Sequence, residues 1–335
     1  MQMDKTESLP PPPGVVGSLK AGFDAIASNL TVILLPLVLD LLLWLGPRLR
    51  VDRLFRPVFD EMFRYARFSG IPAADIKTLQ ENSALLLKQF QQYNLMSTLR
   101  TFPIGVFSLM SGTMPSKTPW GAPPMVVQID SAFILLGWVL LLTVTGWICG
   151  GLFFRWVSLV VTDSSRSIDA RFGQSIVQTM LLSVMYIILA IMIGTPLMVV
   201  FTLVIAASPL LAQGMLLILG LLSMWLIVPI FFTPHGIFMR QQNVFTSIYT
   251  SLRMARFTLP TSSLFVISVL LIAFGLNYIW NIPASDSWMM LVGIIGHAFI
   301  TTSLLAASFI YYRDMQVWLQ TIFEKLKTNI PTQQA

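Results

Sequence analysis

Long runs of apolar residues constrain this chain more than any other feature. Five runs are long enough to cross a bilayer as helices, because the hydrocarbon core is about 30 Å thick and needs about 20 apolar residues. They cover residues 132–157, 176–206, 210–232, 264–280 with its flanks, and 288–312. Composition agrees, since 55% of the residues are apolar and 11% are charged, against about a quarter charged in soluble domains. We therefore expect an all-α, polytopic membrane protein.

A sixth apolar run, residues 30–46, is shorter and contains both Pro36 and Asp40. It would complete about six transmembrane helices in three hairpins, or it could enter the membrane without crossing it. Apolar side chains recur at helical spacing before each hairpin, around residues 19–30, 166–176 and 245–259, which predicts an interfacial amphipathic helix in each place. The middle copy is the thinnest, and any segment that enters a membrane would resemble it.

The positions of lysine and arginine predict the orientation, because short cytoplasmic loops are enriched in these residues. The connections near residues 208–209 and 281–286 contain none, whereas Arg166 and Arg171 lie between the second and third spans. Both termini are therefore predicted in the cytoplasm, with the protein in the cell membrane. The net charge of +6 follows from this orientation and does not indicate nucleic-acid binding.

Residues 1–14 are polar and include four consecutive prolines, which predicts a disordered tail. Residues 15–335 are expected to form a single membrane domain, with residues 47–130 as an amphipathic, interfacial helical insertion between the first two spans. Helices are predicted over 51–63 and 73–96, and the segment 94–112 is expected at the interface. The insertion could bind lipid headgroups or a partner protein through its basic side chains, or only cover helix ends. Those side chains are Arg53, Arg56, Arg64 and Arg67.

Asp40 and His297 are ionisable residues inside apolar runs, where an unpaired charge costs several kcal/mol. At 1.5 Å of rise per residue they lie about 9 and about 14 Å inside the external ends of their spans, depths that allow contact. They could form a proton-linked site, since histidine titrates near neutral pH, or a structural hydrogen bond between helices. Arg155 lies near the end of its run and is predicted to reach the interface.

Small residues mark two helix faces. Gly146 and Gly150 form a GxxxG motif in the second span, and Gly293 and Gly296 belong to a small-residue face of the last span. Such faces allow close helix packing, either within the chain or between copies of it, and the oligomeric state is left open.

Signatures of enzymes are missing. The chain has two histidines and one cysteine, Cys149, too few for a multi-histidine zinc site, and it has no nucleophile elbow or nucleotide-binding loop. We expect no catalytic activity, metal or cofactor. The leading hypothesis is a scaffold or lipid-binding or partner-binding membrane component, with membrane lipids and another membrane protein as candidate partners. The alternative is a small transporter or permease subunit with its site at Asp40 and His297.

Two stretches carry a resemblance to known proteins. AGFDAIASNLTVILLPLVLDLLLWLGPRL and NLMSTLRTFPIGVF resemble segments of an uncharacterised family of multi-pass membrane proteins from green non-sulfur bacteria. The repeated plan, with Tyr311, Tyr312, Arg313 and Asp314 closing the last span, is loosely similar to the membrane domain beside some glycerophosphodiester phosphodiesterases. The resemblance implies a membrane-domain role without catalytic residues, because the chemistry of that second family belongs to a separate soluble domain.

Overall fold

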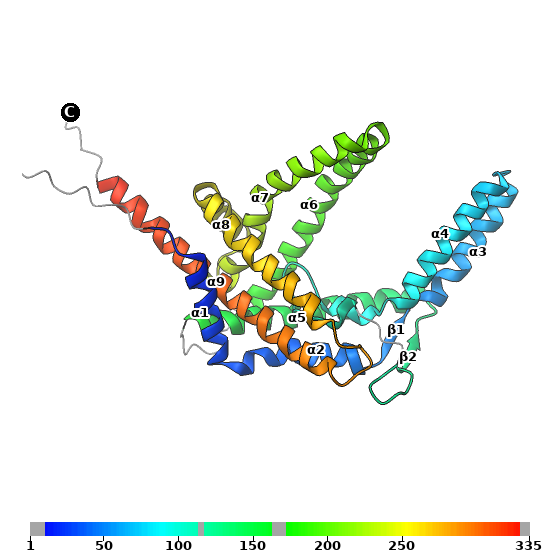
Figure 1. Cartoon of the computed structure of the whole chain (residues 1–335), viewed down its shortest axis with the longest axis horizontal. Coiled ribbons are helices and arrows are strands. Elements are labelled where there is room, and N and C mark those ends of the chain that lie inside the picture. The colour runs from blue at the N-terminus through cyan, green and yellow to red at the C-terminus, as the bar shows by residue number, and fades with distance from the viewer. Residues whose placement is uncertain (1–10, 113–116, 163–171, 329–335) are drawn as a thin grey trace, which may run out of the picture. The chain divides into compact units, whose positions relative to one another are not determined.

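The computed structural model describes residues 11–112, 117–162 and 172–328. Its long apolar helices confirm an all-α polytopic membrane protein (Figure 1). Five of these described helices are long and apolar enough to cross a membrane, and α9 is the most buried, with 61% of its apolar window buried against 0% in α6. They are α5 (Ala132–Thr162), α6 (Phe172–Ala207), α7 (Pro209–Arg240), α8 (Val244–Trp280) and α9 (Met290–Thr328).

The apolar run over residues 30–46 and the stretch before it form a bent pair of helices. α1 (Val15–Ala27) is followed by the 3-10 turn η1 (Leu30–Ile33) and by α2 (Leu34–Leu45). With 12 residues, α2 is about 18 Å long, which is too short for the hydrocarbon core. A sixth span therefore exists only if the bent pair crosses the membrane as one unit.

A break in α8 separates the stretch 244–257 from the apolar part of the helix. The backbone leaves helical geometry at Thr258, with φ −129° and ψ 19°, and Pro260 follows. Proline inside a helix removes an N–H donor and its ring clashes with the preceding turn, which kinks or breaks the helix. A short helix thus precedes this span, as α1 precedes α2. Most of the interfacial helix predicted around residues 166–176 lies in residues 163–171, which are outside the described residues.

The backbone falls into two compact units, and the predicted single membrane domain stays a prediction. Unit 1 comprises Met1–Val32, Phe154–Phe274 and Ile300–Ala335. Its core is aromatic, with the Phe265 and Tyr311 rings stacked at 4.1 Å between centroids. Gly22 lets α1 lie directly on α9, because a Cβ atom there would be 2.6 Å from the Cα of Ala307.

Unit 2 comprises Ile33–Phe153 and Gly275–Phe299 and therefore contains the insertion. Its helices α3 (Asp52–Phe68) and α4 (Ala73–Gln92) form a hairpin, with the Phe55 and Phe90 rings stacked at 4.4 Å (Figure 1). Two short strands, β1 (Arg48–Arg50) and β2 (Val126–Gln128), pair in parallel at the base of the hairpin. The 3-10 turns η2 (Leu95–Leu99) and η3 (Met110–Gly112) complete the unit.

Candidate functional site

Asp40, on α2, is fully buried and accepts three hydrogen bonds. The Ser108 hydroxyl donates to Oδ1 at 2.5 Å, and the backbone N–H groups of Leu109 and Met110 donate to Oδ2 and Oδ1 at 3.1 and 3.0 Å. Hydrogen bonds to an ionised carboxylate are about twice as strong as those between neutral groups. The carboxyl group therefore clamps the chain just before η3 onto α2.

His297, on α9, lies beside this clamp. Its Nδ1 atom is 3.7 Å from Asp40 Oδ2, which exceeds the normal range of a hydrogen bond. Unit 2 thus brings together the two residues that the sequence analysis paired. The Asp40 oxygens are already occupied by donors from residues 108–110, so the geometry favours a structural role for the carboxyl group.

The segment that ends with these donors, residues 95–112, is largely covered by protein. Ile104 and Val106 are 0% and 2% exposed. The interfacial position expected for residues 94–112 stays a prediction. Inside a membrane, irregular backbone is tolerated only where protein buries it or where it lines a water-filled cavity. Asn94 supports its start, because its side-chain oxygen accepts hydrogen bonds from Leu49 N at 3.1 Å and from Met96 N at 3.2 Å.

Gly146 and Gly150 of α5 pack against this segment. A Cβ atom at Gly146 would lie 2.6 Å from the carbonyl oxygen of Leu99, and one at Gly150 would lie 2.6 Å from the Cα atom of Gly105. Both glycines lie near the middle of α5. The GxxxG motif therefore accommodates irregular backbone and not a second transmembrane helix.

Gly293 and Gly296 of α9 face Trp280, the last residue of α8. A Cβ atom at Gly296 would lie 2.6 Å from the indole ring, and one at Gly293 would meet the Trp280 carbonyl oxygen. These glycines make room for a bulky side chain where the two helices meet.

The four arginines of α3 are all solvent-exposed. Arg64 forms an ion pair with Glu61 on the same helix. Near the free end of the hairpin, Tyr65 is 74% and Phe68 is 86% exposed. A cleft of about 720 Å³ lies there, lined by Phe63, Arg64, Arg67, Phe68, Asp60 and Gln80.

Unit 1 contains two further buried polar contacts. His235 Nε2 lies 2.6 Å from Ser308 Oγ, and both residues are buried. The only sequence signal for this pair is a histidine in an apolar stretch of α7. Arg155, predicted to reach the interface, is 9% exposed and donates a hydrogen bond to the carbonyl oxygen of Phe238 at 3.1 Å.

Among the residues that the structure describes, no group of three His, Cys, Asp or Glu side chains could hold a metal ion. No protein-family model, curated protein or solved structure matches the chain.

Proposed function

We propose that this protein is a non-catalytic component of the bacterial inner membrane, with both termini in the cytoplasm, which binds anionic lipid through the α3–α4 hairpin. The observation that supports it is the end of this hairpin, where Tyr65 and Phe68 are 74% and 86% exposed within one helical turn of Arg64 and Arg67. Aromatic rings favour the membrane interface, and guanidinium groups bind phosphate in a bidentate manner.

The expected contribution of the hairpin end is substantial. Full burial of a phenylalanine side chain contributes about 1.5–3 kcal/mol, and each basic residue near an anionic surface contributes about 1 kcal/mol. Phe68 with the two arginines would thus supply roughly 4 kcal/mol of membrane binding. Two large aromatic side chains exposed side by side at the end of a hairpin favour a contact with lipid or protein.

A lipid titration of the full chain in detergent tests the proposal. The chain has one cysteine, so Cys149→Ala with Ser69→Cys places a single polarity-sensitive fluorophore at the turn after α3. We expect its emission to shift to the blue on addition of phosphatidylglycerol. The Arg64→Gln/Arg67→Gln pair should weaken this response about 30-fold, from about 1 kcal/mol per arginine.

Lysines of α4 supply the matched control. Lys77→Gln/Lys88→Gln removes the same charge from the same hairpin and should leave the titration midpoint unchanged. An equal response to phosphatidylcholine, or equal losses in both variant pairs, would refute recognition of anionic lipid by the hairpin end. If the emission shifts only when a protein partner is added, the hairpin end binds that protein and not lipid.

A transporter or permease subunit is the second candidate. Its support is the 3.7 Å distance between His297 Nδ1 and Asp40 Oδ2 inside unit 2. We rank it second because Asp40 already accepts three hydrogen bonds from residues 108–110. Transport activity that Asp40→Asn abolishes, in a variant as stable as the wild type, would reverse this order.

A further inference from the structure

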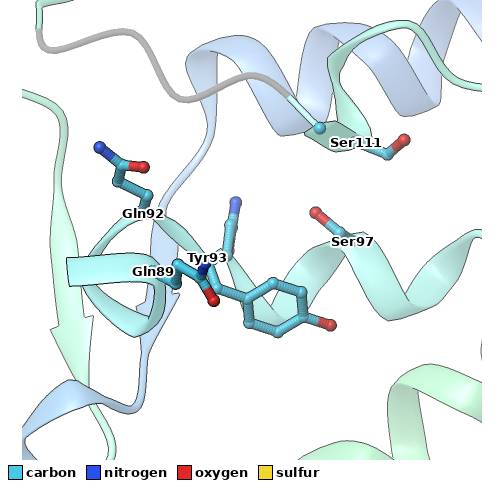
Figure 2. A pocket seen from close by; sticks show the side chains of 7 residues that line it. Gln89, Gln92, Tyr93, Ser97 and Ser111 are labelled. Atoms are coloured by element: carbon cyan, nitrogen blue, oxygen red, sulfur yellow. The ribbon is translucent and has the colours of Figure 1, made fainter. Parts of the chain in front are cut away.

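A small polar pocket lies where α4 meets η2 (Figure 2). Its volume is about 180 Å³, and Gln89, Gln92, Tyr93, Ser97 and Ser111 line it with Asn94 and a glycine. None of these described lining residues is charged. Ser111 lies across the pocket from Ser97 and Tyr93 in Figure 2.

Hydrogen bonds fix two walls of this pocket. Asn94 joins β1 to η2 through its side-chain oxygen, which accepts from two backbone N–H groups. On the opposite side, Arg100 donates to Ser111 Oγ at 3.1 Å, and Ser111 N donates to Ser108 Oγ at 3.0 Å. Ser108 in turn donates to Asp40. The pocket is therefore preformed, which lowers the entropy cost of binding a ligand.

Four other side chains around the pocket have unused hydrogen-bonding capacity. Gln89, Gln92, Tyr93 and Ser97 make no side-chain hydrogen bond to another described residue. Carboxamides and hydroxyls both donate and accept. Partial burial raises the pKa of the Tyr93 phenol, so this group remains a neutral donor at physiological pH.

A ligand's charge and size follow from this lining. The described lining residues offer no carboxylate for a cation, and the Arg100 guanidinium already donates to Ser111. A ligand rich in hydroxyl groups matches side chains that donate and accept equally, and the Tyr93 ring offers an apolar face. The volume corresponds to about six water molecules. It therefore fits a ligand with one ring and excludes a ligand of several linked rings.

We propose that this pocket binds a single neutral sugar ring, either as a free monosaccharide or as the headgroup of a glycolipid. The proposal is independent of anionic lipid binding by the hairpin end. Gln92 and Ser97 provide the hydrogen bonds, and Tyr93 provides the stacking surface.

Saturation-transfer NMR on the full chain in detergent, with methyl β-D-glucopyranoside as the probe, tests this site. We expect a saturable signal that Gln92→Ala/Ser97→Ala weakens at least tenfold. The control, Gln91→Ala/Ser69→Ala, changes the same residue types outside the pocket and should bind like the wild type. Gln92→Glu adds a charge at nearly constant size and should also abolish binding. It serves as the test variant if the alanine pair does not fold.

Vesicles that contain glucosyl diacylglycerol form the second arm. Binding of both probes supports recognition of the sugar itself, and binding of the vesicles alone assigns the site to a glycolipid headgroup. Failure of both probes, or binding that survives Gln92→Ala/Ser97→Ala and Gln92→Glu, overturns the proposal. The Arg64→Gln/Arg67→Gln pair should bind the glucoside normally, which separates this test from that of the proposed function.

Discussion

Replacing Asp40 with alanine should release residues 108–110 from α2. The change removes the acceptor of the Ser108 hydroxyl and of the Leu109 and Met110 amides. A buried donor left without a partner costs about 1–3 kcal/mol. The hydroxyl can rotate to another acceptor, so the two amides dominate, and we expect a loss of about 4 kcal/mol in the free energy of unfolding.

Thermal unfolding of the full chain in detergent measures this loss. The reactivity of Cys149, the only cysteine, reports on opening of α5, where the residue is partly buried. At roughly 2 °C per kcal/mol for a chain of this size, Asp40→Ala should unfold about 8 °C lower. Hydrogen exchange at Leu109 and Met110 should accelerate by about a thousandfold, since each tenfold corresponds to about 1.4 kcal/mol.

Asp24→Ala is the matched control, because it removes a carboxylate of the same charge from an exposed position on α1. It should leave both readouts at their wild-type values. Asp40→Asn keeps one acceptor oxygen and should fall between the wild type and the alanine variant. If Asp40→Ala unfolds together with the Asp24→Ala control and the two amides exchange at wild-type rates, the carboxylate does not hold this segment.

Two further substitutions test packing in each unit separately. Gly150→Leu should abolish folding of unit 2, because even a Cβ atom there collides with backbone. Its control is Gly137→Leu on the same helix, which has open space around it and should express like the wild type. Size-exclusion profiles of the two variants measure the difference. Ser308→Ala removes the polar partner of buried His235 and should lower the free energy of unfolding by about 1–2 kcal/mol. Ser268→Ala, at a partly exposed position of α8, should not change the unfolding temperature.

The positions of the long helices could be predicted because they depend on local properties. Apolar runs longer than the bilayer core is thick must form helices that satisfy their own backbone. The run predicted over 176–206 corresponds to α6 (Phe172–Ala207) and that over 210–232 to α7 (Pro209–Arg240). The ends differ because helices continue past the apolar residues until a cap or a proline stops them.

Part of the candidate site was also visible in the sequence. Asp40 and His297 stand out because each is ionisable within an apolar run, and Gly146 and Gly150 stand out because helical spacing puts them on one face. The first pattern predicts a polar partner for Asp40 and for His297, and the second predicts that another segment packs closely against the two glycines. They do not specify what that neighbour is.

Sequence alone therefore determined the class of the protein, the approximate limits of its five longest apolar helices, and which residues need a partner. Tertiary structure alone decided the partners. Ser108 lies 68 positions from Asp40 along the chain, and the backbone at Gly105 fills the space that Gly150 leaves open. The physical reason is that helix formation depends on neighbours within a few residues, whereas contacts between distant segments depend on how the whole chain packs.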